Sequence, residues 1–469
     1  MSADAASRSS GAPPAAAPPN VPRGEALAFW LKLGCISFGG PAGQIALMHR
    51  ELVERRRWIS EGRFLHALHY CMVLPGPEAQ QLATYLGWLM HRTAGGIAAG
   101  ALFVLPSLLL LIALSWVYLA LGHLPVVAGF FAGMRPAVAA LVLQAVWRLG
   151  SRTLGRPLRT PLRWAIALAA FVAIAGLQAP FPAVVAAAAL AGWLGGRFAP
   201  AQFAGPSAHA AAGTGEGLPA LIDDDTPPPA HARFSRAGLA RIVLAGAALW
   251  AMPWLALAVA WGREGVPAAM AGFFSKAALV TFGGAYAVLP YVNQGAVEQH
   301  QWLTAAQMVD GLALGETTPG PLIMVVAFVG FVGGWTRQVL GSEALAAAGV
   351  LGACVATWFT FLPSFLFILA GGPLVESTRG RIGWTAPLAS ISAAVVGVIA
   401  SLGLFFVSLV ARGDALGPPG PLGLDWPALA LAALALGVLL RGRLGTIPVI
   451  LGCGALGLAW RLVAPLLAL

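Results

Sequence analysis

Long apolar runs recur along the chain from residue 25 almost to the C-terminus, separated by short stretches rich in Pro, Gly and Arg. A helix needs about 20 mainly apolar residues to cross a hydrocarbon layer of roughly 30 Å, and many of these runs are long enough. Hydrophobic residues make up 58% of the chain, charged residues 10%, and the mean hydropathy is +0.79, outside the range of soluble globular proteins. The pattern predicts an all-α polytopic membrane protein without a substantial soluble domain.

The chain contains an internal repeat. Leu105-Pro106-Ser107 resembles Leu362-Pro363-Ser364, and a shift of 244 residues superposes three earlier motifs without a gap. The superposed motifs are Ser37-Phe38-Gly39-Gly40 on Thr281-Phe282-Gly283-Gly284, Trp58 on Trp302, and Pro75-Gly76-Pro77 on Pro319-Gly320-Pro321. Two repeats are therefore predicted, 25–198 and 268–469, each with six apolar elements.

One additional transmembrane helix, 237–262, is predicted between the repeats. An even number of elements returns the chain to its starting side, so one further crossing turns the second repeat upside down. Inverted repeats are typical of secondary transporters, which hold their substrate near the midplane between the halves. The remaining segments are a tail, 1–24, which lacks the features of a secretory signal and is expected to be disordered, and a cytoplasmic linker, 199–236.

The first two elements of each repeat are interrupted by Gly or Pro, so each is either a broken spanning helix or a hairpin that re-enters on its own side. The loop 48–63 carries five arginines, whereas its equivalent, 293–306, carries no Lys or Arg. The positive-inside rule therefore favours re-entrant hairpins, with nine crossings, a cytoplasmic N-terminus and an external C-terminus. If every element spans, there are thirteen crossings and the same orientation of the ends.

Charge and cysteine usage argue against several functions. The net charge of +10 comes largely from arginines in short loops beside apolar spans, so nucleic-acid binding is not expected. Four isolated cysteines and one helical pair, His66 and His69, do not make a metal site, so neither a metal nor another cofactor is predicted. The chain has no Walker motif, which excludes a built-in ATPase.

The two lysines of the chain, Lys32 and Lys276, coincide under the 244-residue shift. A lysine inside a bilayer costs at least about 2.5 kcal/mol and usually faces a cavity or a partner, although snorkelling to the headgroups also accounts for both positions. Each precedes a hydroxyl and two adjacent glycines, which either serve close helix packing or leave backbone N–H groups for an anion. The predicted oxyanion site comprises Lys32, Ser37, Phe38, Gly39, Gly40, Lys276, Thr281, Phe282, Gly283 and Gly284.

The second element of each repeat is broken at Pro-Gly-Pro, where freed carbonyls would hold a cation or water. Glu78 and Glu316 lie on opposite sides of the two breaks, as candidate proton carriers, as counter-ions of the lysines, or as structural hydrogen-bond partners. Arg135, another intramembrane cation, either lines the anion path or forms a structural ion pair. The predicted break and coupling residues are Pro75, Gly76, Pro77, Glu78, Gln81, Glu316, Pro319, Gly320 and Pro321.

Several of these motifs resemble the long-chain chromate ion transporters of the CHR family. The second half contributes Thr281-Phe282-Gly283-Gly284 and Pro319-Gly320-Pro321. The stretches in the first half are Phe38-Gly39-Gly40-Pro41, His49-Arg50-Glu51-Leu52-Val53 through Arg57-Trp58-Ile59, Leu74-Pro75-Gly76-Pro77-Glu78-Ala79-Gln80-Gln81, and Gly95-Gly96 through Phe103-Val104-Leu105-Pro106. Two positions depart from the expected pattern, His69 for Asn and Gly43 for Ala, and neither removes a charged group.

The resemblance implies a bacterial inner-membrane protein that exports chromate from the cytoplasm and confers chromate resistance, with sulfate as competitor or counter-substrate, as in an antiporter. Membrane lipid is the other expected partner, and assembly as a homodimer stays open. We therefore expect a secondary carrier and not an enzyme. The alternatives are a carrier of sulfate or another oxyanion, and an anion channel lined by the same cations.

Overall fold

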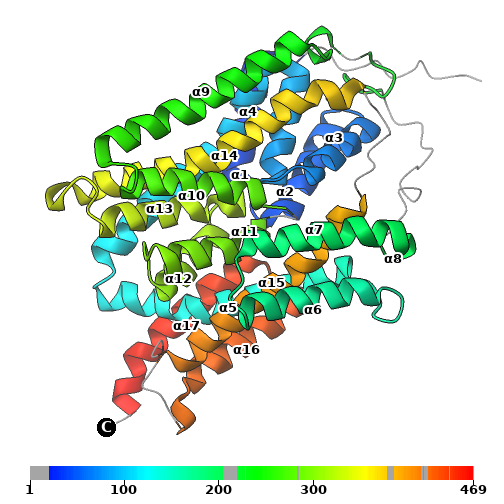
Figure 1. The fold of residues 1–469 in the computed structure, drawn as a ribbon. Coiled ribbons are helices and arrows are strands. Elements are labelled where there is room, and N and C mark those ends of the chain that lie inside the picture. The colour runs from blue at the N-terminus through cyan, green and yellow to red at the C-terminus, as the bar shows by residue number, and fades with distance from the viewer. Residues whose placement is uncertain are drawn as a thin grey trace, which may run out of the picture.

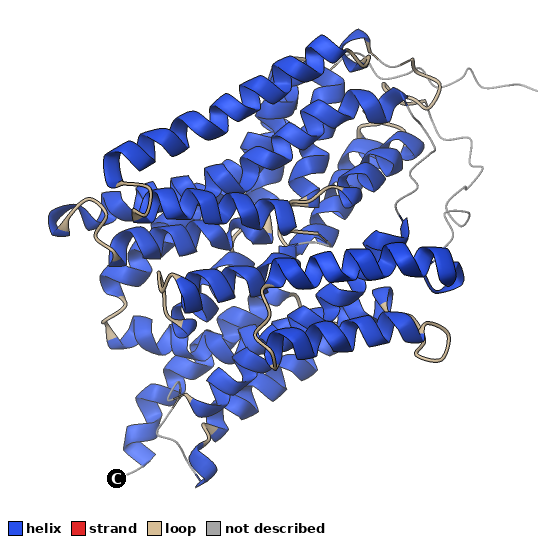
Figure 2. Ribbon diagram, in the orientation of Figure 1, coloured by secondary structure: helices blue, strands red, loops and turns tan. Residues whose placement is uncertain are grey.

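The protein is helical throughout the part of the chain that the structure describes. This computed structural model describes residues 21–203, 219–227, 229–282, 285–377, 385–413, 416, 421–442 and 444–467. These residues form helices and loops with no strand beyond one isolated bridge between Ile59 and Ile222 (Figure 2). The predicted all-α class is confirmed. The expected tail, up to residue 20, and 204–218 of the expected linker lie outside the described residues.

The first repeat starts with short helices and continues with longer ones (Figure 1). A π-helical turn, Arg50–Arg55, extends α2. The helices are α1 (Arg23–Ile36), α2 (Gly40–His49), α3 (Glu61–Val73), α4 (Glu78–Leu121), α5 (Pro125–Thr153), α6 (Pro161–Ala175) and α7 (Phe181–Phe198).

The second repeat follows the short α8 (Pro200–Phe203) and the connecting helix α9 (Arg236–Trp261). Its π-helical turn, Asn293–Gln299, extends α11, and the shift of 244 residues places it on the turn that extends α2. The helices are α10 (Val266–Val280), α11 (Ala285–Val292), α12 (Ala305–Thr317), α13 (Val325–Thr336), α14 (Leu345–Ser377), α15 (Thr385–Arg412), α16 (Trp426–Arg441) and α17 (Thr446–Leu467). The same shift moves the bounds of α3 onto those of α12.

Seven helical stretches among the described residues are long and apolar enough to cross a membrane, which identifies a multi-pass membrane protein. They lie in α4, α5, α7, α9, α14, α15 and α17. Seven of the nine crossings predicted from the sequence correspond to them. The other two correspond to α6 and α16, which have 15 and 16 residues and are shorter than the roughly 20 needed for a full crossing.

Helix α4 consists of two antiparallel arms, 78–90 and 93–121. The backbone leaves the helical region at His91 and Arg92, where Arg92 has φ 60°. The second arm then runs back along the first. The two lie so close that a Cβ added to Gly96 would be 2.9 Å from the Thr84 carbonyl oxygen. A Cβ added to Gly100 would lie 2.2 Å from the Thr84 hydroxyl, so the close approach depends on these glycines. The second arm alone is the long apolar stretch.

After each break in the first repeat the chain returns to the end at which it started. Arg56, which follows α2, forms an ion pair with Glu25 near the start of α1 (3.0 Å), and its guanidinium lies over the ring of Phe29. His91, at the end of the first arm of α4, donates to the carbonyl of Val21 (2.9 Å). The N-terminus of α1 and the turns that follow both broken elements therefore lie together.

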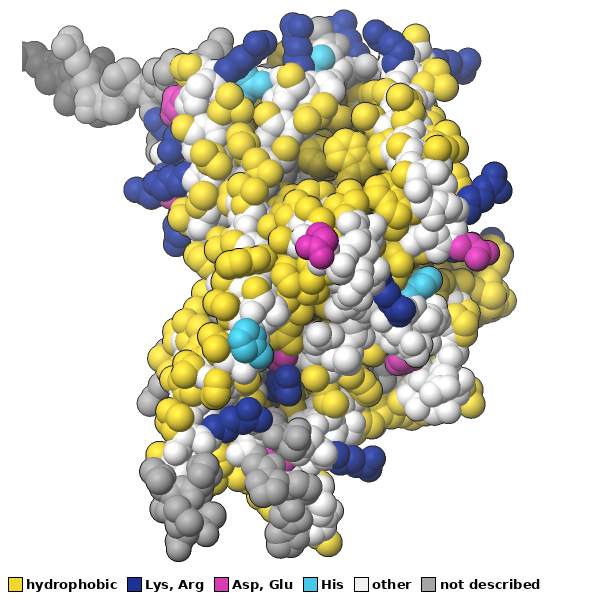
Figure 3. Space-filling view, turned by 90° about the vertical axis from the view of Figure 1, so that its left-hand side faces the viewer, with side chains coloured by type: hydrophobic (Ala, Val, Ile, Leu, Met, Phe, Trp, Pro, Cys, Tyr) yellow, Lys and Arg dark blue, Asp and Glu magenta, His cyan; other side chains and the backbone are white. Residues whose placement is uncertain are grey.

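In the second repeat the turns that follow α11 and α13 likewise lie together, beside the end of α9 and at the opposite end of the molecule. Helix α9 starts beside the linker and its 26 residues rise about 39 Å, at 1.5 Å per residue. At its far end the Trp261 indole donates to the carbonyl of Val339 (2.9 Å), and Arg337 donates to the carbonyls of His300 and Gln301. Figure 3 shows this end face-on, with individual charged side chains set among hydrophobic ones.

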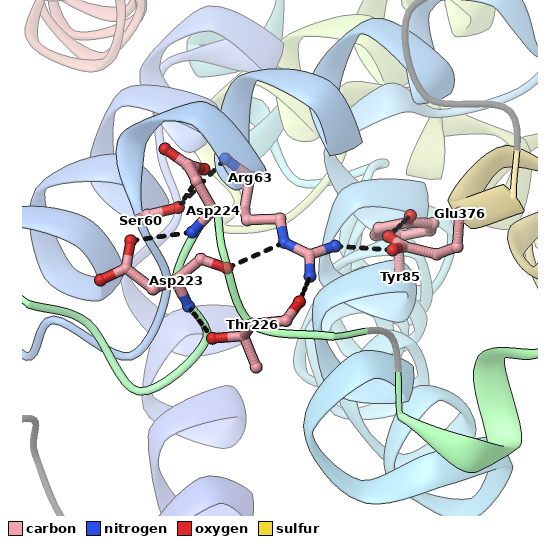
Figure 4. A network of polar contacts seen from close by, with 7 residues as sticks. All are labelled: Ser60, Arg63, Tyr85, Asp223, Asp224, Thr226 and Glu376. Carbon is pink, nitrogen blue, oxygen red and sulfur yellow. Dashed lines mark hydrogen bonds and ion pairs between the residues drawn. The ribbon is translucent and has the colours of Figure 1, made fainter. Parts of the chain in front are cut away.

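Part of the linker packs against the first repeat. The N–H of Ser60 donates to the carbonyl of Ile222 (3.0 Å), and the Ser60 hydroxyl donates to Asp224 (2.7 Å). Arg63 donates to the carbonyls of Asp223 (3.2 Å) and Thr226 (2.5 Å), as Figure 4 shows. This stretch of the predicted loop thus forms an ordered cover over the start of α3.

The two repeats also cross directly where α5 meets α17. A Cβ added to Gly457 would lie 2.3 Å from the Cα of Gly133, and one added to Gly133 would lie 2.4 Å from the carbonyl oxygen of Cys453. Small residues are the usual means of bringing helix backbones together inside a bilayer. The crossing therefore has no room for a methyl group at either glycine.

Replacing Gly457 with Ala should force α17 away from α5 and lower the melting temperature by several degrees, because overpacking costs about 1–3 kcal/mol. The measurement is thermal unfolding of the purified protein in detergent. Gly452→Ala on the same helix is the matched control, since a Cβ there meets nothing within 4 Å. Equal melting temperatures for the two variants would contradict the crossing.

Candidate functional site

Four predicted helix breaks lie where helices end and begin. α1 ends at Ile36 and α3 at Val73, and α2 and α4 begin a few residues later. In the second repeat α10 and α12 end, and α11 and α13 begin, at the equivalent positions. Each helix end leaves backbone groups without intrahelical partners, and these need other partners inside a membrane.

Two backbone hydrogen bonds join the breaks across the repeats. The N–H of Gly76 donates to the carbonyl of Thr281 (2.8 Å), and the N–H of Gly320 donates to the carbonyl of Ser37 (2.7 Å). The shift of 244 residues carries Ser37 onto Thr281 and Gly76 onto Gly320, so the two bonds are equivalents of each other. The Gly-Gly break of each repeat is thereby held against the Pro-Gly-Pro break of the other.

The contact requires glycine at both Pro-Gly-Pro breaks. Gly76 and Gly320 have φ +123° and +109°, which other residues adopt only with strain. A Cβ on Gly76 would lie 2.4 Å from the Ser364 hydroxyl, and one on Gly320 would lie 2.6 Å from the Cβ of Ser107. Ser107 and Ser364 occupy the same position of the Leu-Pro-Ser motif, so each repeat supplies the serine that packs on the other's break.

Buried hydroxyls at these contacts lack partners. Ser37, Ser107 and Ser364 are each 0% exposed, and their hydroxyls find no hydrogen-bond partner among the described residues. Leaving a buried polar group unsatisfied costs about 1–3 kcal/mol, so three such hydroxyls at the contacts between the repeats make this crossing the candidate site. Sequence reasoning included Ser37 but missed Ser107 and Ser364, although the Leu-Pro-Ser motif that marks them was visible in the repeat.

The first Gly-Gly break is open. Gly39 and Gly40 have φ +90° and +72°, and a Cβ on either would meet nothing within 4 Å. Phe38 beside them is 41% exposed, whereas Phe282 is half-buried. Gly283 and Gly284 lie outside the described residues. The N-terminus of α2, with its partial positive charge, thus faces open space at Gly39 and Gly40.

Glutamine side chains satisfy carbonyls at the breaks. The Gln81 amide donates to the carbonyl of Pro75 (2.7 Å), a group that the sequence analysis assigned to a cation or water. The Gln44 amide donates to the carbonyl of Gly320 (2.5 Å) and lies 3.3 Å from that of Ser37. Pro77, Pro319 and Pro321 are buried around these contacts.

The lysines lie on other helix faces than the hydroxyls. Lys32 and Lys276 are exposed, whereas Ser37 and Thr281 are buried. Five residues turn an α-helix by about 500°, so the two members of each pair point about 140° apart. Arg55, which donates to Glu51, holds the pKa of that carboxyl below its usual value, and nearby Lys32 contributes to the same shift. A role for the lysines in binding stays a prediction.

The two carboxylates of the breaks differ in their surroundings. Glu316 is 9% exposed and accepts a hydrogen bond from the hydroxyl of Tyr286 on α11, a partner that the sequence did not indicate. Glu78 is half-buried and is the first residue of α4, where a negative charge interacts favourably with the helix dipole. The asymmetry predicted for these positions extends to their contacts.

Two ion pairs link the equivalent helices α3 and α12 each to a helix of the opposite repeat. Arg135 on α5 donates two bonds of 2.9 Å to Asp310 on α12, which also accepts from Tyr118 (2.8 Å). The structural ion pair considered for Arg135 is therefore present, and Asp310 was missed. Arg63 on α3 pairs with Glu376 on α14 at 2.6 Å (Figure 4). Helices α3 and α12 are repeat equivalents, and their paired residues carry opposite charges.

Comparison with known proteins establishes the relationship. The model of a family described as chromate transporters matches residues 24–193 and 268–458, which make up most of the chain. The chain belongs to the chromate transporter family. Membership makes it a transport protein and not an enzyme. The two matched stretches start within one residue of the repeats predicted from sequence.

Named relatives of this chromate transporter family member match between part and nearly all of its length. A chromate transport protein of Pseudomonas aeruginosa is 33% identical over 446 residues, which cover 94% of this chain and 93% of that relative. A chromate transport protein of Cupriavidus metallidurans is 29% identical over 371 residues, or 79% of each. The uncharacterized transporter YwrB of Bacillus subtilis is 30% identical over 135 residues, 29% of this chain and 68% of its own length. No solved structure matches.

Replacing Gly320 with Ala should destabilise the crossing, because the new Cβ meets Ser107 in addition to straining the backbone. Strain costs about 1–3 kcal/mol and overpacking about as much again. The measurement is thermal unfolding in detergent. Gly262→Ala controls for backbone strain alone, since Gly262 has φ +82° and open space around its Cβ position. Should Gly320→Ala unfold no earlier than the control, the packing of Ser107 on the break would be refuted.

Proposed function

We propose that this protein exports chromate from the cytoplasm across the bacterial inner membrane and thereby confers chromate resistance. It acts as a secondary carrier, with sulfate as a competing or counter-transported oxyanion. Two relatives that cover most of the chain bear the name chromate transport protein. The observation that carries the proposal is the group of unpaired buried hydroxyls at the crossing of the repeats.

A tetrahedral dianion matches the donors at this crossing. The hydroxyls of Ser37, Ser107 and Ser364 are buried and have no partner in the described part of the chain, so an ion that accepts hydrogen bonds from them removes the cost of leaving them unsatisfied. Gly39 and Gly40 leave the N-terminus of α2 open to an anion. In the proposal Phe38, Thr281, Phe282, Gly283 and Gly284 complete the site.

Lys32 and Lys276 supply positive charge to the path in this proposal. Their exposed positions suit long-range attraction of the ion better than direct contact with the buried hydroxyls. Glu78 and Glu316 serve as coupling groups near the breaks. At an inside-negative potential of 100 mV, export of a dianion is favoured by about 4.6 kcal/mol, so weak coupling suffices.

The contacts at the two ends support re-entrant hairpins in inverted repeats. Arg56 pairs with Glu25, and His91 bonds Val21, so both broken elements of the first repeat return to their own end. The arginine-rich loop then lies on the cytoplasmic side together with the N-terminus. A carrier built this way alternates access by moving one repeat against the other around the crossing.

Uptake of labelled chromate into inverted membrane vesicles tests the proposal, with and without excess sulfate. Ser107→Ala with Ser364→Ala should reduce chromate uptake at low concentration about tenfold or more, because hydrogen bonds to charged groups contribute about 1.5–3 kcal/mol. Ser115→Ala is the matched control, since this buried serine of α4 already bonds the carbonyl of Leu111. Wild-type vesicles that take up no chromate would refute chromate export, and unchanged uptake by the double variant would remove the serines from the site.

The same assay separates the alternatives. A carrier gives saturable uptake that a counter-ion accelerates, whereas an anion channel gives neither. Transport of sulfate without transport of chromate would identify a carrier of other oxyanions. Lys32→Ala with Lys276→Ala tests the lysines, and unchanged transport would exclude them from the mechanism.

The proposed topology predicts the side from which introduced cysteines are labelled. In a protein lacking its four cysteines, Arg55→Cys should react with an impermeant thiol reagent only from the cytoplasmic side, because the loop returns there. Gln338→Cys, an exposed position at the other end, should react only from outside. Labelling of position 55 from outside would refute the hairpin model.

A further inference from the structure

A cavity of about 380 Å³ opens between the repeats, away from the crossing of the breaks. Its volume lies within the range of roughly 300–1,000 Å³ that is usual for small-ligand sites. The second arm of α4 runs from the linker end to this cavity, so the cavity lies at the opposite end of the molecule. The polar residues that line it are Tyr118, His123, Arg135, Gln307, Asp310 and Arg461.

Among the described residues that line this cavity, positive charges outnumber negative ones. Arg135 and Arg461 line it together with one carboxylate, that of Asp310. Asp310 is fully buried and holds the guanidinium of Arg135 in a two-bond pair, while the Arg135 side chain stays 26% exposed. Arg461 is exposed on α17, and a Cβ added to Gly129 would lie 3.6 Å from its Cδ. Asp310 thus holds the guanidinium of Arg135, and Arg461 lines the same cavity from α17.

The opposite end is closed at the equivalent place. Arg63 and Glu376 form an ion pair there in which the two side chains are only 4% and 1% exposed. The carbonyls of Asp223 and Thr226 cover Arg63, so that the linker seals this pair from solvent (Figure 4). A sealed ion pair thus lies at one end of the molecule and an open cavity lined by two arginines at the other.

We propose that the cavity lined by Arg135 and Arg461 is a second oxyanion site, through which a tetrahedral dianion leaves the protein. This inference rests on the proposed function. Arginine suits such an ion because its planar fork of donors matches two oxygens at once. Asp310 offsets the charge of Arg135 and keeps binding weak, and an ion on a conduction path must be able to leave.

A second cavity at this end does not share these properties. Its volume is about 480 Å³, and its charged lining residues are Glu298 and Arg412. One carboxylate balances one guanidinium there, so a dianion gains no net attraction. Arg412 therefore offers a matched control for Arg461.

The test is protection of an introduced cysteine by sulfate. His123→Cys, at an exposed position of the cavity, is placed in the full-length protein without its native cysteines. Membrane vesicles of both orientations are treated with a charged thiol reagent, so the readout depends neither on topology nor on transport. Sodium sulfate should slow modification of position 123, and sodium chloride of the same ionic strength should not.

Variants of the arginine identify the site. Arg461→Gln should raise the sulfate concentration for half-protection about tenfold, the effect of losing one charge-assisted interaction. Arg461→Lys should keep part of the protection, because the charge remains while the fork of donors is lost, and Arg412→Gln should leave it unchanged. Absence of protection, equal protection by chloride, or equal effects of Arg461→Gln and Arg412→Gln would each overturn the proposal.

Chromate uptake by the same vesicles separates this inference from the proposed function. If chromate is transported while sulfate fails to protect position 123, only the second site is refuted. If sulfate protects but chromate is not transported, the proposed function is refuted and the oxyanion site stands without a role in chromate exit.

Discussion

The two reciprocal hydrogen bonds between the breaks are the contact on which the arrangement of the repeats depends. A helix interrupted inside a bilayer leaves backbone groups that water cannot satisfy there. Gly76 uses the carbonyl of Thr281, and Gly320 uses that of Ser37, so each repeat satisfies a group that the other leaves open. This exchange demands glycine at both donors and brings the Leu-Pro-Ser serines onto them. The backbone groups that the interrupted helices leave unpaired are therefore the same groups that join the repeats.

On this paired framework the side chains are not symmetric. Gln44 bonds the carbonyl of Gly320, whereas its equivalent position holds Val288, which has no polar group. Helix α3 presents Arg63 to the opposite repeat, and helix α12 presents Asp310. The first pair is sealed by the linker and the second borders a cavity. Equivalent backbones thus present different chemistry at the two ends of the molecule.

The sequence predicted the class of fold and the positions of the breaks, because Gly and Pro mark interrupted helices directly. It also predicted the equivalence of the halves, since one shift carries the bounds of α3 onto those of α12. It did not reveal which break would meet which, because the hydrogen bonds of Gly76 with Thr281 and of Gly320 with Ser37 join residues far apart in the chain and leave no local signature. For the same reason an ion pair was only one of two readings of Arg135, and its partner Asp310 was missed.

The lysines show the limit of reasoning from rarity. Two lysines at equivalent positions drew attention, yet the helix turns them away from the hydroxyls that follow. Ser107 and Ser364, whose hydroxyls have no partner among the described residues, were not predicted as site residues. Serine is common in membrane helices and usually bonds its own backbone. The structure shows instead that these two serines pack on Gly320 and Gly76 of the other repeat.

The seating of Ser364 on Gly76, and of Ser107 on Gly320, also bears on how such a chain evolves. A side chain introduced at either glycine would collide with a serine encoded in the other half of the gene. The two halves therefore cannot change independently at these positions after duplication. Compensating changes have to arise in the opposite copy. The duplicated segments are thus bound into a single evolutionary unit, even though side chains such as Gln44 and Val288 differ at equivalent positions.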